Sequence, residues 1–253
     1  ATWRGGMRSN ILAWLLKMAG LRVTLLQGGY KAFRNYLLPI LDVEYKIIIL
    51  GGQTGSGKTE MLSLLKSAGE QVIDLEHLAS HKGSAFGLLG MPEQPSQEQF
   101  ENMLALELEK IDPRIPVWLE NESRLIGRII IPPALFELMR VMKVIEVMVS
   151  REQREVRIGN EYCIFDAELL AHHTERIAKR LGPQHAKRAI ELLHSGDKAA
   201  WLQIVLDYYD KTYTHSNQQR DRNSISEVPF DWNEPEVGIR RILNAKDKMI
   251  AVK

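Results

Sequence analysis

The stretch Lys46-Ile-Ile-Ile-Leu-Gly-Gly-Gln-Thr-Gly-Ser-Gly-Lys-Thr59 decides the fold. Its apolar run, Ile47 to Leu50, is typical of a buried parallel strand. The run passes directly into Gly52-x-x-x-x-Gly57-Lys58-Thr59, a complete phosphate-loop (Walker A) pattern, and a helix-forming segment follows at once. Because strand, glycine loop and helix in this order are the context that the motif requires, the sequence predicts a bound phosphorylated ligand rather than an idle glycine-rich turn.

The loop residues are of the types that phosphate binding needs. Glycines let backbone N–H groups close around a phosphate, where a Cβ atom would obstruct them. The start of the following helix adds a partial positive charge. We expect Lys58 to reach the terminal phosphates and the Thr59 hydroxyl to ligate Mg²⁺ where that ion is used. The remaining phosphate-binding residues are expected to be Gly52, Gln53, Thr54, Gly55, Ser56 and Gly57.

Composition limits the class of protein. The chain has 253 residues, enough for one large or two modest domains with a buried core. A formal net charge of +1 excludes a uniformly basic nucleic-acid coat but leaves room for a local basic face. The single cysteine, Cys163, excludes an intrachain disulfide framework and fits a reducing compartment. No apolar run approaches the ~20 residues of a membrane span, so we expect a cytoplasmic protein with no membrane partner.

Residues 1–42 have the pattern of the end of a domain. The chain opens in a glycine loop, Thr2 to Ser9, with no strand before it. A helical stripe over about 10–18, a short strand over Val23–Leu26 and a helix over about 32–41 follow. These elements amount to half an α/β unit, so we expect strands that belong upstream of residue 1.

Two of these segments resemble parts of tRNA 2-selenouridine synthases. Trp3-Arg-Gly-Gly-Met-Arg-Ser9 is similar to the active-site loop of the rhodanese-like domain in that family, and Leu26-Gln-Gly-Gly-Tyr-Lys-Ala-Phe33 resembles the segment that ends it. In the family, a P-loop domain with a motif similar to Gly52–Thr59 comes next. The resemblance spans most of the chain and weakens after about Asn217.

The resemblance and the residues together predict the architecture. The expected class is α/β: a P-loop domain with a parallel sheet flanked by helices, preceded by the C-terminal part of a rhodanese-like α/β domain and followed by a helical region. Residues 1–42 are expected to form the rhodanese-like part. Residues 43–253 are expected to form the P-loop domain, with the helical region from about residue 167.

The resemblance also implies an activity. Family members are enzymes that convert wobble 2-thiouridine of tRNA to 2-selenouridine through an S-geranylated intermediate, with geranyl diphosphate and selenophosphate as substrates. The implied partner is the anticodon region of tRNA. The phosphate loop is expected to hold the allylic diphosphate and to stabilise the departing pyrophosphate, with Lys58 as a catalytic residue.

One position departs from the family pattern. The catalytic cysteine of the rhodanese-like loop would lie just before Trp3, where this sequence has Thr2. A threonine hydroxyl stays protonated near neutral pH and cannot form a persulfide or selenopersulfide. We therefore expect impaired selenium transfer, with an anion still held by the loop residues Arg4, Gly5, Gly6 and Arg8. Natural loss of the cysteine and an engineered or divergent position both explain Thr2.

Acidic and basic residues follow the next predicted strand. Gln71 to Glu76 is expected to be a strand, which would put Asp74 and Glu76 on one face near the ligand-binding rim. The glycine-rich loop that follows carries His81 and Lys82 and suits a segment that closes over substrate. An ordinary surface loop is the alternative, and the resemblance favours substrate contact.

A third strand, Val117-Trp-Leu-Glu120, ends in an acid in a Walker-B-like arrangement. Glu120 is expected to hold Mg²⁺ or its bound water, or to orient a nucleophile, although such an acid is often only a helix cap or surface pair. Arg124 is placed for a diphosphate. Arg151 belongs to a helix on which arginines recur every three residues, an arrangement that suits either a phosphate-binding lid or a solvated face.

The basic helices and the single cysteine of the later part of the chain each allow two interpretations. Lysine and arginine on its helices suit an RNA backbone, or simply solubility. Cys163 lies in an apolar setting and is interpreted as packing, with replacement of the missing nucleophile as the alternative.

The whole sequence leaves three functional hypotheses. The first is the tRNA-modifying transferase. The second is a small P-loop kinase or ATPase in which Asp74 or Glu120 is the base, and the third is a tRNA-binding relative without catalysis.

Overall fold

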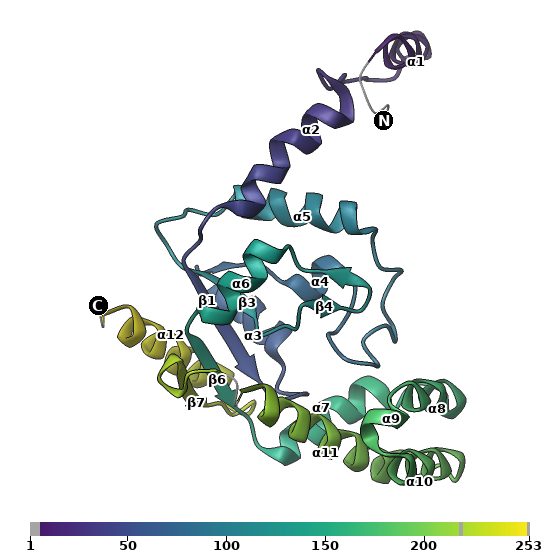
Figure 1. The fold of residues 1–253 in the computed structure, drawn as a ribbon, viewed down its shortest axis with the longest axis vertical. Helices are drawn as coiled ribbons and strands as arrows, with labels where there is room; N and C mark the ends of the chain where they lie inside the picture. Colours follow the sequence, from purple (N-terminus) through teal and green to yellow (C-terminus); the bar gives the residue numbers. More distant parts are fainter. Residues whose placement is uncertain (1–5, 218–219, 252–253) are drawn as a thin grey trace.

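A parallel five-stranded sheet forms the centre of the molecule (Figure 1). The computed structural model describes residues 6–217 and 220–251. The strand order is β2-β3-β1-β6-β7, and every neighbouring pair is parallel. These strands are β1 (Ile47–Gly52), β2 (Gln71–Val72), β3 (Val117–Glu120), β6 (Val144–Met148) and β7 (Ile225–Pro229). The α/β class and the parallel sheet are therefore confirmed.

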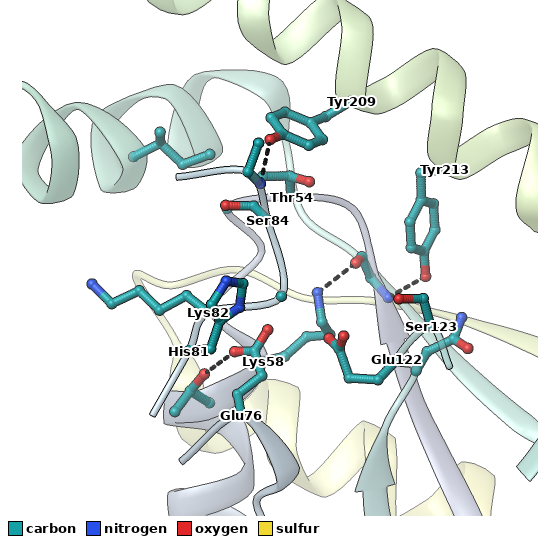
Figure 2. Close-up of a pocket in the computed structure, with 18 of the residues that line it drawn as sticks. Thr54, Lys58, Glu76, His81, Lys82, Ser84, Glu122, Ser123, Tyr209 and Tyr213 are labelled. Carbon is teal, nitrogen blue, oxygen red and sulfur yellow. Dashed lines mark hydrogen bonds between the residues drawn. The ribbon is translucent and has the colours of Figure 1, made fainter. Parts of the chain in front are cut away.

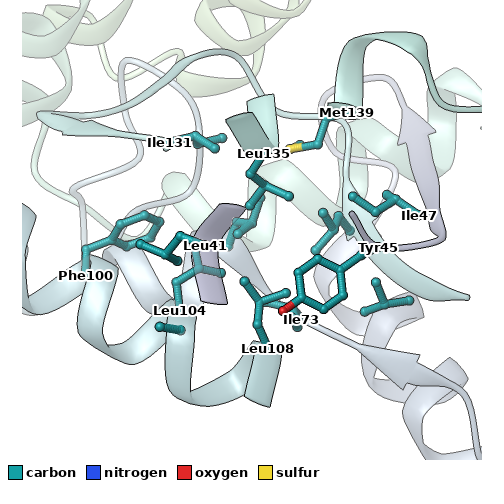
Figure 3. Close-up of a cluster of buried hydrophobic side chains, with 14 of the residues drawn as sticks. Leu41, Tyr45, Ile47, Ile73, Phe100, Leu104, Leu108, Ile131, Leu135 and Met139 are labelled. Atoms are coloured by element: carbon teal, nitrogen blue, oxygen red, sulfur yellow. The ribbon is translucent and has the colours of Figure 1, made fainter. Parts of the chain in front are cut away.

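Helices cover both faces of this sheet, as β1 requires. Ile47 and Ile49 point to one face and Ile48 and Leu50 to the other, and all four are buried. On the first face they meet η1 (Leu38–Asp42), α4 (Leu75–Ala79), α5 (Gln97–Glu109) and α6 (Pro133–Val141) (Figure 3). On the second face they meet α3 (Lys58–Ser67) and α12 (Pro235–Ala251). A strand buried on both sides explains why its sequence is an unbroken apolar run.

A separate helical region lies beside the carboxyl ends of the strands. Its helices are α7 (Arg151–Tyr162), α8 (Ala167–Arg176), α9 (Ala178–Leu181), α10 (Pro183–His194) and α11 (Lys198–Asn217). They share their own core, in which Trp201 and Leu206 are fully enclosed. The predicted helical region is confirmed. Within the described residues, no helix combines the length and apolar character needed to cross a membrane.

The first segment differs from its predicted pattern. It contains α1 (Met7–Met18) and α2 (Gly29–Leu37), which continues into η1. The predicted strand Val23–Leu26 is wrong: these residues form no strand, because none of the described strands runs beside them. Thr2, Arg4 and Gly5 lie outside the described residues, Gly6 is the residue before α1, and Arg8 lies in its first turn.

The predicted strand Gln71–Glu76 is also too long. Only Gln71–Val72 is strand, and the chain turns into α4 at Leu75. The Asp74 side chain accepts a hydrogen bond from the His77 N–H at 2.6 Å, so it caps this helix. Asp74 and Glu76 are therefore not alternate residues of one strand.

The sheet's last strand was missed from sequence. β7 follows η2 (Arg222–Ser224) and pairs with β6 from Val144↔Ile225 to Met148↔Pro229. A short hairpin of β4 (Leu125–Ile126) and β5 (Ile129–Ile130) lies apart from the main sheet. β7 is short, mixes polar and apolar residues and ends in proline, so nothing local separates it from a loop.

Candidate active site

The phosphate loop has the backbone geometry that its glycines predict. Gly55 and Gly57 both have a φ of 83°, a region that other L-residues rarely adopt. A Cβ atom on Gly57 would also collide with the Trp232 ring, and one on Gly55 would lie 2.5 Å from Ile158. The helix α3 begins at Lys58, directly after the loop. Side chains are therefore excluded here by both conformation and space.

Residues distant in sequence hold this loop in place. Trp232 donates its Nε1–H to the Ser56 carbonyl oxygen at 2.9 Å, and Arg154 donates to the Thr54 carbonyl oxygen at 3.2 Å. Arg154 is buried and is itself held by Asp210 at 2.8 Å. In a trans peptide the N–H points away from the carbonyl oxygen. The N–H groups of Gly55 and Gly57, which follow the Thr54 and Ser56 carbonyls, therefore face away from the Arg154 and Trp232 side chains. The arrangement leaves those donors for a ligand.

A large cavity opens from the loop. Its volume is about 1430 Å³, which exceeds the ~300–1,000 Å³ of a site for one drug-sized ligand. The phosphate loop, the segment after α4, the segment after β3, α7 and α11 all contribute to its wall. Part of that wall is apolar, formed by Met91, Phe136, Met139, Ile158 and Ile177. The cavity therefore joins a phosphate-binding edge to an apolar surface.

Lys58 and two acids form the polar floor. Lys58 donates to the Gly52 carbonyl oxygen at 2.9 Å, and Figure 2 shows it between Glu76 and Glu122. Burial raises the pKa of Glu76, which Lys58 partly offsets. Burial and then repulsion from Glu76 raise the pKa of Glu122 well above its ordinary value. The two carboxyls therefore repel each other once both are ionised, and a bound cation relieves that repulsion.

The floor suits a hard cation. Thr59 Oγ1 lies 3.5 Å from Glu76 Oε2, so a hydroxyl and carboxylates meet beside the phosphate loop. Oxygen donors of this kind are what Mg²⁺ prefers, with phosphate oxygens and water completing its shell. No cluster of three or more His, Cys, Asp or Glu suited to a metal occurs in the described part of the chain. An ion here would therefore depend on the ligand's phosphates.

Glu120 lies away from this floor. Its side chain has 0% exposure and is absent from the cavity wall. Its Oε2 accepts the Leu75 N–H at 3.0 Å, and burial, then the neighbouring Asp74, raise its pKa well above the ordinary value. The structure thus brings Glu120 and Asp74 together beneath the rim, while Glu122 reaches the cavity. The catalytic role given to Glu120 stays a prediction.

The arginines of α7 do not share one side. Arg151 pairs with Glu155 at 2.7 Å and with Asp207 at 2.7 Å, and it does not line the cavity. Arg157 does line it, pairs with Glu60 at 2.5 Å and lies 3.8 Å over the Trp232 ring. Arg124, predicted for a diphosphate, also lines the cavity.

The predicted closing loop contributes to the cavity wall. His81 is 5% exposed, its ring fits between Gly87 and Gly127, and its Nδ1 has no hydrogen-bond partner among the described residues. Burial lowers the pKa of His81, so the neutral ring is favoured. Lys82 pairs with Glu161 at 2.5 Å. Both residues line the cavity, together with Glu76. Their contact with a substrate remains a prediction.

Sequence reasoning did not assign Tyr213 to the phosphate loop. Its hydroxyl accepts the Gly52 N–H at 2.7 Å (Figure 2). The same hydroxyl donates to Glu146 at 2.7 Å. The tyrosine lies on α11, 161 residues after Gly52. No local pattern joins positions so far apart. Glu122 and Arg157 carried a weak signal, because Glu122 lies two residues after Glu120 and Arg157 belongs to the same arginine series as Arg151.

Comparisons with known proteins agree with these features. A family model described as the tRNA 2-selenouridine synthase AAA domain matches residues 45–229. A tRNA 2-selenouridine synthase from Sulfurovum sp. (strain NBC37-1) is 35% identical over 268 residues, covering 93% of this chain and 71% of the relative. One from Shewanella halifaxensis (strain HAW-EB4) is 36% identical over 255 residues, covering 87% and 68%. Among solved structures, TT1252 from Thermus thermophilus has a TM-score of 0.40 at 15% identity, covering 83% of this chain and 100% of that one. Because the family model spans most of the chain and the relatives exceed 30% identity, the chain belongs to the tRNA 2-selenouridine synthase family of enzymes.

Proposed function

We propose that the chain modifies wobble 2-thiouridine of tRNA, first to an S-geranyl form with geranyl diphosphate and then to 2-selenouridine with selenophosphate. The names of its relatives support tRNA and 2-selenouridine. The observation that carries the geranyl step is the continuity of the phosphate loop with an apolar cavity wall. A diphosphate joined to a branched hydrocarbon needs both surfaces in one cavity.

In the first step the protein acts mainly on the leaving group. The thiocarbonyl sulfur attacks the allylic carbon, a C–S bond forms, the C–O bond breaks and pyrophosphate leaves. The alkylated base then loses its N3–H proton, which passes to the departing pyrophosphate or to water. Lys58 and the loop N–H groups stabilise the charge that develops on the pyrophosphate. Sulfur is a soft nucleophile, so no protein base is needed to activate it.

A divalent cation fits the same floor. Thr59, Glu76 and Glu122 are the residues that would hold it, directly or through water. When bound, it adds positive charge beside the departing pyrophosphate. Glu76 and Glu122 then serve to position that charge next to Lys58.

The apolar wall orients the other end of the substrate. Phe136 and Met139 of α6 lie on one side of the cavity, and Ile158 of α7 lies near the phosphate loop. Excluding water from the allylic carbon favours attack by sulfur over hydrolysis.

The second step is expected to be impaired in this sequence. The rhodanese-like loop that would carry selenium has Thr2 in place of cysteine, and a hydroxyl cannot form a selenopersulfide. Cys163 does not offer a substitute, because it is half-buried in the helical region and burial raises its pKa. We therefore propose that geranylation is retained and selenation is weak or lost.

Mass spectrometry of the wobble nucleoside tests both steps. The chain is incubated with 2-thiouridine tRNA and geranyl diphosphate, and selenophosphate is added afterwards. We expect a geranyl adduct with the wild type, none with Lys58→Ala, and more 2-selenouridine with Thr2→Cys than with Thr2. Absence of the adduct, together with ATP hydrolysis and no binding of geranyl diphosphate, would show a P-loop ATPase or kinase instead. Binding of tRNA without turnover of any diphosphate would show a relative without catalysis.

A further inference from the structure

One part of the cavity wall is not used by the diphosphate chemistry. It is formed by Tyr208 on α11 and Arg180 on α9, both in the helical region. The Tyr208 ring is half-exposed, and its hydroxyl has no hydrogen-bond partner in the part of the chain that the structure describes. The adjacent Tyr209 differs, because its hydroxyl accepts the Ala85 N–H at 3.0 Å and so braces the loop after α4.

The two tyrosine rings are in contact, with centroids 5.1 Å apart and planes inclined by 62°. Tyr209 supports one side of Tyr208, so the Tyr208 ring is held in place while part of it faces the cavity. A rigid aromatic ring with an open face is the structure that nucleobases stack on.

Arg180 supplies a free positive charge beside these rings. Its side chain is exposed and makes no ion pair or hydrogen bond within residues 6–217 and 220–251. Burial raises the pKa of the Tyr209 hydroxyl to about 12, and the positive charge of Arg180 opposes this rise. The Arg180 guanidinium is therefore close to the tyrosines. By contrast, Lys82 and Arg157 of the same cavity are both engaged by carboxylates.

Arg124, on the segment after β3, also lines the cavity. Its side chain too is exposed and has no ion pair or hydrogen bond in the described ranges. Unpaired arginines on two segments of the cavity wall, with an aromatic ring beside one of them, suit a charged polymer that places one planar group inside.

We infer that Tyr208 and Arg180 form the subsite for an unstacked nucleotide of the RNA substrate, with the base on the Tyr208 ring and an adjoining phosphate on Arg180. The inference rests on the proposed function, because it places the nucleotide that accepts the transferred group. The volume of about 1430 Å³ leaves room for a nucleotide next to a diphosphate. A base that reacts must leave its stack to reach an enclosed site, and a tyrosine face compensates for the stacking that is lost.

Binding measurements on full-chain variants test the inference. The probes are 2-thiouridine tRNA and geranyl diphosphate, each titrated alone and at several salt concentrations. Tyr208→Ala should weaken tRNA binding about 5- to 150-fold, the range for losing one stacked base, and leave diphosphate binding within about threefold. Tyr208→Phe keeps the ring and should bind tRNA like the wild type.

Arg180→Ala should weaken tRNA binding and reduce the slope of log Kd against log salt by about 1. Arg240→Ala is the matched control, because Arg240 is an exposed arginine on α12 that does not line the cavity. It should leave both affinity and slope unchanged. Retained diphosphate binding in each variant shows that the fold is intact.

Three results would overturn the inference. Unchanged tRNA binding in both Tyr208→Ala and Arg180→Ala would remove the subsite. Weaker binding of geranyl diphosphate, with tRNA unaffected, would make Tyr208 part of the hydrocarbon wall. If the wild type itself does not bind tRNA, the proposed function fails first and the inference with it.

Discussion

Replacing Glu120 by glutamine should leave the reaction nearly intact, whereas the same change at Glu122 should not. The Glu120 side chain has 0% exposure and its Oε2 accepts the Leu75 N–H at 3.0 Å. A glutamine oxygen can accept that hydrogen bond, and its amide can donate to Asp74. Glu122 instead lines the cavity near Lys58.

The expected losses of activity differ between the two variants. For Glu120→Gln, kcat/KM of geranylation should change by less than about threefold, which is about 0.7 kcal/mol. For Glu122→Gln it should fall by about 10- to 100-fold, or about 1.4–2.7 kcal/mol, as is usual when a group that orients a metal or its ligands loses its charge.

Stability should depend on pH in a way that isolates Glu120. Burial raises the pKa of Glu120 well above its ordinary value of 4.5, so the native state keeps a proton that the unfolded chain releases above that pH. The wild type therefore loses stability as pH rises from there through the folded-state pKa. Glu120→Gln has no such proton, so its free energy of unfolding relative to the wild type should be larger at a mildly alkaline pH than at a pH just above 4.5.

Urea unfolding at the two pH values and single-turnover geranylation provide the measurements. Glu120→Ala serves as the contrast, because it leaves the buried Leu75 N–H without a partner and should therefore be about 1–3 kcal/mol less stable than Glu120→Gln at either pH. A hundredfold loss of activity in Glu120→Gln, with normal activity in Glu122→Gln, would refute the reasoning and support the Walker-B role predicted for Glu120.

Three further predictions test how the site and its supporting helices are held. Tyr213→Phe leaves the Gly52 N–H without its 2.7 Å partner, so calorimetry should show weaker geranyl diphosphate binding and a lower Tm, for a loss of about 1–3 kcal/mol; unchanged values would contradict this role. Trp201→Ala removes a ring that is 1% exposed and should cost about 3–5 kcal/mol in urea unfolding with an unchanged m-value, and a loss below about 1 kcal/mol would contradict the packing. Gly57→Ala should abolish diphosphate binding, because its Cβ atom would collide with the Trp232 ring. Gly69 has a similar φ of 92° but open space around it, so Gly69→Ala should cost about 1–2 kcal/mol of stability and leave binding intact. Equal effects of the two variants on binding would contradict the steric argument.

The sequence was sufficient where the determining interactions are local. The phosphate loop, the strand before it and the helix that begins at Lys58 lie in one short stretch, and its glycines report the backbone conformation directly. The strand Val117–Glu120 was predictable from its short apolar run, and all four of its residues are buried. The helix from Gln97 was predictable from its own periodicity.

Elements that depend on distant partners were not predictable in this way. The strand β7 is stabilised by pairing along its whole length with β6, about 80 residues earlier, rather than by its own pattern. Asp74 could extend a strand or cap a helix, and the bond from the His77 N–H selects the cap. Neither outcome follows from residue types alone.

The arginine spacing of α7 shows the limit of a pattern argument. Residues three apart on a helix are separated by about 300°, so each step shifts the side chain by about 60° and two steps by about 120°. Arg151 and Arg157 therefore reach different partners, the acids of α11 and the ring of Trp232. Only Arg157 lines the cavity, although both satisfied the same sequence rule.

The helical region completes the phosphate site. The loop's own residues supply the N–H groups and Lys58, but its conformation is held by Tyr213 and by Arg154, which Asp210 fixes. Tyr213 and Asp210 lie on α11, the same helix that presents Tyr208 to the cavity. A nucleotide that stacks on Tyr208 would therefore restrain the helix that also positions Gly52, so we expect the two substrates to be coupled through α11.

Coupling through α11 predicts that tRNA tightens the binding of geranyl diphosphate. By linkage, the diphosphate should tighten the binding of tRNA by the same factor. Tyr213→Phe removes the connection at Gly52 without altering the Tyr208 ring, so it should reduce that factor toward 1 while tRNA still binds. Equal coupling in the variant and the wild type would show that α11 does not transmit it.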